Sequence, residues 1–178
     1  VTSAILALAP LVAGGLVEDA GIIVDSYSGL SGAGRQYNAK RSNLFVDIDE
    51  NLVAYAVGNH KHTPEIEMGL SRAAKRPIQV TFVPHLAPLD RGILTTAFAR
   101  PRAGLTTARA LESLRAFYTP ERAPFVRVLD KVDQVAVGNV VRGNYCDISA
   151  QVIERTNLLV VASALEEMRH LNVATVNY

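Results

Sequence analysis

Residues 144–164, NYCDISAQVIERTNLLVVASA, hold two strand patterns separated by a turn. Residues 144–155 alternate, with Ile148, Ala150 and Val152 toward one face and Asp147, Ser149 and Gln151 toward the other. That alternation predicts a strand whose polar face meets water or a wet interface. Thr156-Asn157 predicts a hairpin turn. Residues 158–164 are apolar throughout, which is typical of a strand covered on both faces.

Other strand patterns occur along the rest of the chain, at residues 21–27, 52–57, 78–83, 93–100, 125–129 and 135–141. Helical spacing is found in residues 2–16, 63–74 and 106–118, and a Pro-rich turn is predicted at residues 84–88. Strands outnumber helices, and short turns join several neighbours. We therefore predict an α+β fold: a mixed or antiparallel sheet with helices packed on one face.

Length and composition narrow the class of protein. The 178 residues are 49% hydrophobic and carry a formal net charge of +1, which suits one packed domain and gives no nucleic-acid footprint. The single cysteine, Cys146, excludes an internal disulfide framework and fits a cytoplasmic protein. No apolar run reaches the length of a membrane span. The sequence opens on Val1 inside a helical pattern, so we expect residues 1–178 to be a single domain of a longer protein.

Two histidines, His60 and His62, stand two residues apart just before a helix-start signal. Thr63 is a good N-cap, Pro64 suits the first helical position, and Glu65 is acidic in the first turn. The positive end of the helix dipole lowers the pKa of a nearby imidazole and favours bound anions, which suits proton transfer on an anionic substrate. The alternative is a polar turn whose histidines only hydrogen-bond the backbone.

A glycine-rich loop follows the predicted strand at residues 21–27. Its residues 28–35 hold three glycines and end on Arg35, so several backbone N–H groups can approach one anion. The alternative is a flexible connection. A third polar cluster runs from His85 to Arg91.

These three clusters come at the ends of predicted strands, where sites are commonly built. Their contents are complementary, and if they converge, the substrate is small and negatively charged. A zinc site from His60, His62, Glu65 and His85 is the rival, although this spacing is not specific for a metal and we assign none. Cys146 lies within an alternating strand, which favours a packing residue over a nucleophile.

Together these motifs resemble the N-acetyl-gamma-glutamyl-phosphate reductase family. The matching stretches run in family order from the start of the chain to about residue 165. They are residues 2–8, Ser28-Gly29-Leu30-Ser31-Gly32-Ala33-Gly34-Arg35, residues 49–52, His60-Lys61-His62-Thr63-Pro64-Glu65, residues 80–86, Arg91-Gly92-Ile93-Leu94, Val141-Arg142-Gly143-Asn144 and Cys146-Asp147-Ile148. A sister branch acts on an aminoadipyl phosphate in lysine biosynthesis, and these motifs barely separate the two.

The resemblance implies a two-domain, NADP-dependent enzyme of arginine biosynthesis. Its second domain resembles the C-terminal domain of glyceraldehyde-3-phosphate dehydrogenases, and this chain matches that domain alone. In the family, a cysteine attacks the acyl phosphate, phosphate leaves, and hydride from NADPH reduces the thioester to a semialdehyde. The nucleophile lies just upstream of the helix at residues 2–16, so Cys146 does not match it, and the nucleotide domain is not in these residues.

The resemblance also implies roles for single residues. His60 and His62 match a histidine pair of which one is the acid/base, and Glu65 is expected to orient it. Ser31, Gly32, Ala33 and Gly34 match the loop that borders the nicotinamide. Arg35, Arg91 and His85 are candidates for contacts with the substrate carboxylate or phosphate. Residues 165–178 depart from the family's pattern, so no cofactor contact is carried over to them.

Three functions are compatible with these patterns. The first is the catalytic and dimerisation domain of an acyl-phosphate reductase, inactive by itself without the nucleophilic cysteine and the nucleotide domain. The second is a small-anion binding or dimerisation module without catalysis, and the third is a metal-dependent hydrolase. The first and second predict self-association into at least a dimer, and none predicts a nucleic-acid or membrane partner.

Overall fold

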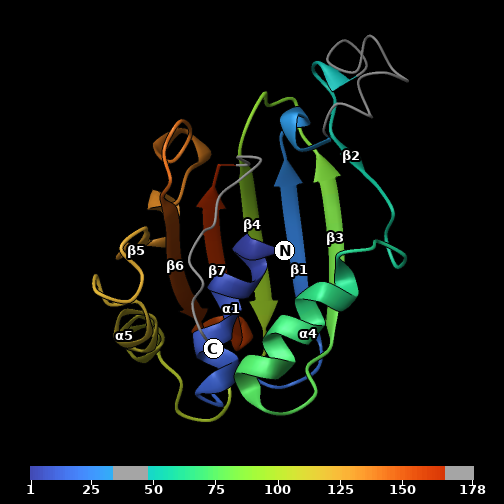
Figure 1. Cartoon of the computed structure of the whole chain (residues 1–178). Coiled ribbons are helices and arrows are strands. Elements are labelled where there is room, and N and C mark those ends of the chain that lie inside the picture. The colour runs from blue at the N-terminus through green and yellow to red at the C-terminus, as the bar shows by residue number, and fades with distance from the viewer. Residues whose placement is uncertain (34–47, 167–178) are drawn as a thin grey trace.

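The computed structural model describes residues 1–33 and 48–166 and places them in one mixed sheet with helices against it (Figure 1). The sheet has seven strands in the order β2-β3-β1-β4-β7-β6-β5. Neighbouring strands are antiparallel except β1 with β3 and β5 with β6. The strands are β1 (Ile22–Ser28), β2 (Val53–Ala54), β3 (Val80–Leu86), β4 (Ile93–Ala99), β5 (Val126–Val128), β6 (Cys146–Ile153) and β7 (Leu158–Leu165). The predicted α+β class is confirmed.

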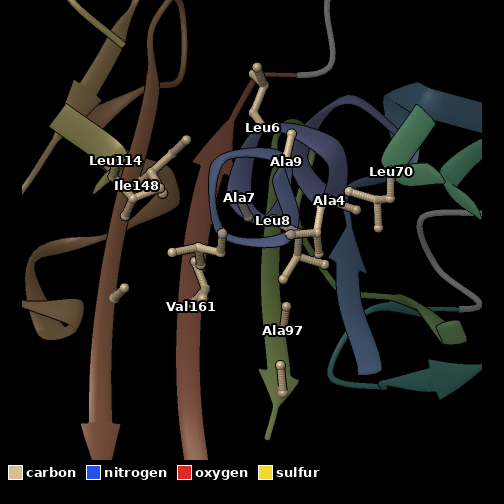
Figure 2. Packing of buried hydrophobic residues seen from close by; sticks show 14 of the residues in the cluster. Ala4, Leu6, Ala7, Leu8, Ala9, Leu70, Ala97, Leu114, Ile148 and Val161 are labelled. Carbon is tan, nitrogen blue, oxygen red and sulfur yellow. The ribbon is translucent and has the colours of Figure 1, made fainter. Parts of the chain in front are cut away.

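The α-helices of the described residues cover one face of the sheet (Figure 1). They are α1 (Thr2–Ala13), α4 (Thr63–Ala74) and α5 (Thr107–Phe117). Between helices and sheet lies the main core, where Leu8, Leu70, Leu114, Ile148 and Val161 are fully buried (Figure 2). Each such side chain contributes about 1.5–3 kcal/mol by leaving water, so this layer holds the fold together. None of the described helices is long and apolar enough to cross a membrane.

Helix α1 is the central, almost wholly buried helix. It ends at Ala13, three residues before the end of the predicted range 2–16, because Gly14-Gly15 follow and Gly15 takes a positive φ of 62°. Its approach to α4 is close, because a Cβ at Gly69 would stand 2.4 Å from Cδ1 of Ile5. No side chain caps its N-terminus, where Val1 occupies the N-cap position. The hydroxyl of Ser3 is instead hydrogen-bonded to Thr95 of the sheet.

That hydroxyl belongs to a buried network under the first turn of α1. The Oγ of Ser3 lies 2.7 Å from Oγ1 of Thr95, which lies 2.8 Å from Oγ of Ser26. Ser163 donates its hydroxyl to the carbonyl oxygen of Ser3 at 3.0 Å. Buried polar groups are costly unless they are paired. The network therefore fixes the start of α1 over β1, β4 and β7.

The opposite face of the sheet is covered only in part. Residues 132–140 were predicted to contribute a strand at residues 135–141, but they form two 3₁₀ turns, η2 (Val132–Gln134) and η3 (Val137–Asn139). Val135 and Val140 pack on Ala162 and Ala164 of β7. The predicted strand was wrong because the apolar residues of this segment pack against β7 and lie in 3₁₀ turns instead of a β-strand.

This cover also overturns the expectation that the polar face of β6 meets water. Asp147 and Ser149 are buried, and only Gln151 of that row is exposed. Arg127 neutralises Asp147, donating from Nε at 2.6 Å and from Nη2 at 2.9 Å. Strand β7 is buried on both faces from Val161 onward, whereas Val160 is only partly buried, so the predicted cover on both faces holds for the second half of the strand.

The Pro-rich turn predicted at residues 84–88 begins later than expected, because β3 continues through Pro84 and His85. Pro84 accepts a hydrogen bond from the N–H of Tyr55 at 3.0 Å. Proline has no backbone N–H and so can donate no hydrogen bond toward β2. None is needed there, because β2 pairs only with His85 and Leu86 of β3. A proline is tolerated there because the ladder has already ended. Of the strand predicted at residues 52–57, only β2 forms.

Candidate functional site

His60 and His62 lie on the turn that leads into α4. Their ring centroids are 4.7 Å apart, and the backbone N–H of His62 donates to Nδ1 of His60 at 3.1 Å. Helix α4 starts at Thr63 with Pro64 in its first turn, so His62 and not Thr63 occupies the N-cap position. The two imidazoles therefore stand together at the positive end of a helix of 12 residues.

The environment of His60 is aromatic and partly dry. The rings of Tyr55 and Phe82 lie edge-on to it at 5.5 and 5.2 Å. Burial lowers the pKa of His60, and the positive charge of Lys61 adds to the effect. Burial also lowers the pKa of His62. Both rings are therefore mainly neutral at pH 7, the form that accepts a proton.

Helix α4, which the histidine pair precedes, packs against α1, because a Cβ at Gly69 would stand 2.4 Å from Cδ1 of Ile5. Glu65 is exposed in the first turn of α4 and makes no hydrogen bond to either imidazole within the described residues. Its charge raises the pKa of both histidines, against the larger effect of burial. Glu65 acts on the pair through its charge and not by direct orientation.

The loop after β1 and the loop before β4 are joined by their backbones. The N–H groups of Gly29, Leu30 and Ser31 donate to the carbonyl oxygens of Gly92, Leu89 and Asp90 at 2.9, 2.9 and 3.0 Å. A Cβ at Gly29 would stand 3.0 Å from the backbone of Arg91, so glycine is needed for this approach. The loop of Ser31 and the loop of Arg91 thus come together, whereas these hydrogen bonds do not include the turn of His60 and His62.

Residues Ser31, Gly32 and Ala33 form a single 3₁₀ turn, η1 (Leu30–Ala33). The Oγ of Ser31 is buried and has no hydrogen-bond partner within the described part of the chain. Such a hydroxyl is available to a ligand. Gly34 and Arg35 lie outside the described residues.

Arg91 meets a carboxylate that sequence reasoning missed. Nη1 of Arg91 donates to Oε1 of Glu166 at 3.2 Å, and the Glu166 side chain is fully buried, while Arg91 is 51% exposed. The second oxygen of Glu166 accepts from the backbone N–H of Arg142. The available signal was the carboxylate of Glu166 directly after the largely apolar residues 158–165, where a charged side chain needs a partner.

His85 stands apart from the histidine pair. It alternates with Phe82 along β3 so that Phe82 faces the helices and His85 faces the other side of the sheet. Its ring stacks on Tyr27 with centroids 4.7 Å apart and 14° between planes. Nδ1 of His85 lies 2.9 Å from Oδ1 of Asp25, without the geometry of a hydrogen bond. Tyr27 donates to the other oxygen of Asp25 at 2.9 Å, which raises the pKa of Tyr27.

The rival zinc site is therefore not assembled, because His85 and the pair His60 and His62 lie on opposite faces. Among residues 1–33 and 48–166, no three side chains of His, Cys, Asp or Glu are grouped to hold a metal.

Cys146 is a core residue of β6. It is 1% exposed, and burial followed by the charge of Asp147 raises its pKa to about 12. A thiol with that pKa is protonated at neutral pH and is a poor nucleophile. The assignment of Cys146 as a packing residue is consistent with this position.

Comparison with known proteins gives relatives over nearly all of the chain. The profile of the family described as "Semialdehyde dehydrogenase, dimerisation domain" matches residues 1–167. N-acetyl-gamma-glutamyl-phosphate reductase of Geobacter sulfurreducens is 46% identical over 168 residues, which are 94% of this chain and 47% of that protein. The enzyme of the same name from Citrifermentans bemidjiense is 44% identical over the same shares of the two chains. The chain spans about half the length of the curated relatives it matches.

Solved structures show the same architecture at low sequence identity. Aspartate semialdehyde dehydrogenase from Francisella tularensis superimposes with a TM-score of 0.69 at 15% identity, over 93% of this chain and 58% of that one. A probable aspartate-semialdehyde dehydrogenase from Pseudomonas aeruginosa gives the same TM-score and identity, over 93% and 55%. At this identity the likeness concerns the fold alone.

Proposed function

Because the chain belongs to the semialdehyde dehydrogenase dimerisation-domain family, we propose that it is the substrate-binding and dimerisation domain of an NADP-dependent N-acetyl-gamma-glutamyl-phosphate reductase. The intact enzyme converts N-acetylglutamyl 5-phosphate to the semialdehyde and phosphate, in the cytoplasm, as a step of arginine biosynthesis. The names of the relatives favour this substrate over the aminoadipyl phosphate of the lysine branch. The observation that carries the proposal is the neutral histidine pair at the start of α4, the helix that packs against α1.

The hydrogen bond within the pair divides the two roles. Nδ1 of His60 accepts the N–H of His62, so a neutral His60 carries its proton on Nε2 and is a donor there. Neither ring nitrogen of His62 has a hydrogen-bond partner within the described residues, so one of them is free to accept a proton. We assign His62 as the general base for the thiol and His60 as a donor to the substrate oxygen that becomes negative.

The thiol itself is assigned by resemblance to the residue group just upstream of α1. A cysteine there sits at the positive end of a helix and beside neutral imidazoles, and both features favour the thiolate. Its attack on the acyl carbon forms the thioester and releases phosphate, and splits one hard reduction into two steps. Cys146 takes no part, because its pKa is about 12 and its side chain is buried in the core.

The loop at Ser31 fits a dinucleotide that approaches from outside the sheet. The orphaned Oγ of Ser31 offers a hydrogen bond, and the tight contact of Gly29 with the backbone of Arg91 holds η1 in place. When bound, the nicotinamide supplies the hydride that reduces the thioester. Ser31, Gly32 and Ala33 would border it, with Gly34 next along the chain.

We also propose that the chain self-associates through the open face of the sheet, on the side away from the helices. Ile23 is 43% exposed there, and Leu94, Phe98 and Val160 of the neighbouring strands are partly exposed beside it. An apolar patch across three strands favours a partner over water. A specific dimer would bury about 1,200–2,000 Å² in total.

The test is an assay of the intact enzyme in which this chain is joined to its nucleotide domain, run as phosphate-dependent oxidation of the semialdehyde. His62→Ala is expected to lower kcat about 10²–10⁴-fold because the base is lost. Cys146→Ala, a buried change, and Arg155→Gln, a charge change in the turn η4 (Glu154–Thr156), are the controls and keep kcat within about twofold. Normal turnover by His62→Ala would end this assignment, and loss of turnover in Cys146→Ala would mean that the nucleophile is misassigned.

The second candidate is a small-anion binding or dimerisation module without catalysis. It is favoured by the burial of the one cysteine of this sequence. An intact protein that binds the substrate and shows no turnover would support it.

A further inference from the structure

A surface hollow of about 780 Å³ lies between the loop before β4 and the loop after η3. Its walls carry two arginines, one from each loop. The lining residues are Leu89, Asp90, Arg91, Val137, Gly138, Val141 and Arg142. The hollow adjoins the Ser31 loop, because Ser31 is hydrogen-bonded to Asp90. It is therefore a neighbour of the proposed cofactor loop.

Glu166 holds both arginines at this hollow. One oxygen of its fully buried carboxylate accepts from Nη1 of Arg91, and the other accepts from the backbone N–H of Arg142. Arg142 has a φ of 66°, in the left-handed region that costs a non-glycine residue about 1–2 kcal/mol. The hydrogen bond to the buried carboxylate of Glu166 holds the Arg142 backbone in this region, so the fold fixes where Arg142 leaves the loop.

The walls of the hollow are rigid as well as charged. Gly92 has a φ of 92°, and a Cβ on it would stand 2.5 Å from Cγ1 of Val137. Gly29 presses on Arg91 from the other side, where a Cβ would meet its backbone at 3.0 Å. The backbone of Arg91 is thus held in place before any ligand arrives, which reduces the part of the entropy cost of binding that comes from ordering the loop.

The charges select the kind of ligand. Arg91 and Arg142 carry two positive charges and Glu166 one negative charge, which leaves one positive charge to be neutralised. Asp90 lies 3.6 Å from Nε of Arg91, but its side chain is 83% exposed, so solvent screens it. The guanidinium of Arg142 has no ion-pair or hydrogen-bond partner in the described part of the chain. One carboxylate balances this set, whereas a phosphate dianion leaves a surplus of negative charge.

A second charged hollow shows the contrast. Arg127 lies there with Asp147, Asp130 and Asp133, and Asp147 already takes two of its donors. Its guanidinium also stacks over the ring of Tyr145 at 4.4 Å. An arginine in a hollow is therefore not enough to make an anion site. Arg142 differs from Arg127 because its guanidinium donors have no partner within the described residues.

We propose that the hollow at Arg91 and Arg142 is a carboxylate subsite, that Arg142 is its specificity-determining residue, and that Glu166 is its positioning residue. Resting on the proposed function, the group it takes is the α-carboxylate of the N-acetylglutamyl substrate. Arg142 then distinguishes substrates that carry a carboxylate at this point from those in which it is masked as an amide.

The test is an NMR titration of the chain with N-acetylglutamine, which has one carboxylate, and with its uncharged α-amide. N-acetylglutamine is expected to shift Gly92 and the resonances of both arginines saturably, and the amide to bind at least about tenfold more weakly, as loss of a charge-assisted pair requires. Arg142→Gln keeps the backbone N–H to Glu166 and is expected to lose about tenfold in affinity. The matched control is Arg155→Gln, at the turn η4 (Glu154–Thr156) on the other end of the hairpin, with unchanged affinity.

Glu166→Gln supplies an independent readout, because it raises the charge of the set by one. Inorganic phosphate should then gain affinity relative to N-acetylglutamine, a reversal that a purely structural role of Glu166 would not produce. Folding of each variant is checked first by its amide spectrum. If Glu166→Gln does not fold, the Arg142→Gln arm decides alone.

Equal affinity of Arg142→Gln and the wild-type chain overturns the assignment of Arg142. Shifts confined to other parts of the chain, or no saturation, overturn the subsite itself. Neither result depends on turnover. If the intact enzyme turns over but the hollow does not bind N-acetylglutamine, the proposed function stands and the subsite falls. If the hollow binds N-acetylglutamine but the intact protein shows no turnover, the subsite stands and the proposed function falls.

Discussion

The two faces of the sheet differ more than any other two regions of the molecule. On the helix side, β1, β4 and β7 present Val24, Ala97 and Val161, all fully buried under α1 (Figure 2). On the open side, the next residues of β1 are Ile23, Asp25 and Tyr27, and none of them is buried. The same three strands therefore build a dry core on one side and a mixed, half-wet surface on the other.

This difference separates stability from function. The helix side is filled by close packing that needs no partner, so its residues report on the free energy of unfolding. The open side carries apolar side chains together with the group Asp25, Tyr27 and His85, whose polar atoms are only partly satisfied. Such a surface is typical of an interface, where apolar contacts and polar register act together. The two faces should therefore respond to mutation through different measurements.

The largest effect is expected on the helix side. Leu8→Ala removes a side chain that is 0% exposed, and should lower the free energy of unfolding by about 2–5 kcal/mol through the lost burial and the cavity left behind. Val160→Ala, on the open side of β7, is the matched control and should cost about 1 kcal/mol or less. Urea unfolding at two protein concentrations measures both. Equal losses for the two variants would erase the distinction between the faces.

On the open side the change is expected in association. Ile23→Asp places an unpaired charge in the proposed dimer contact, which should weaken the dimer by about 3 kcal/mol or more, over a hundredfold in Kd. Met68→Asp is the control, because Met68 is 69% exposed on the outer side of α4. Sedimentation equilibrium at micromolar concentration gives the masses. A wild-type chain that sediments as a monomer, or an Ile23→Asp chain that stays dimeric, contradicts the sheet-mediated dimer.

Much of the helix side was predictable from the sequence, and much of the open side was not. Helical spacing gave α4 at its observed bounds, α5 within one residue at each end and the start of α1, whereas α1 ends three residues before the predicted range. The open side depends on how distant segments pack, which local patterns do not encode. Residues 135–141 therefore looked like a strand, and the polar face of β6 looked exposed, until residues 132–140 were seen to cover it.

The candidate site divides in the same way. The pair His60 and His62 is a local motif, and its meeting follows from a spacing of two residues. The contact of Arg91 with Glu166 joins residues 75 apart, and the backbone strain at Arg142 exists only in the folded chain. His85 was grouped with the other histidines because it follows a strand in the sequence. His85 lies apart from them because alternate residues of β3 point to opposite faces of the sheet, and His85 points away from the helices.

The smallest expected effect tests whether His60 and His62 really belong to the dry side. Burial lowers their pKa values in the folded chain below 6.5, the value they regain on unfolding. Between the folded-state pKa values and 6.5 the unfolded chain binds more protons, so the free energy of unfolding should fall as the pH falls through this window and stay level above it. The double variant His60→Gln, His62→Gln should have a flatter profile there, because glutamine does not titrate. Urea unfolding of both chains between pH 5 and pH 8 measures the slopes, and the imidazole resonances give the midpoints. Parallel profiles, or midpoints at or above 6.5, would place the pair in water and remove the physical basis for a neutral base at pH 7.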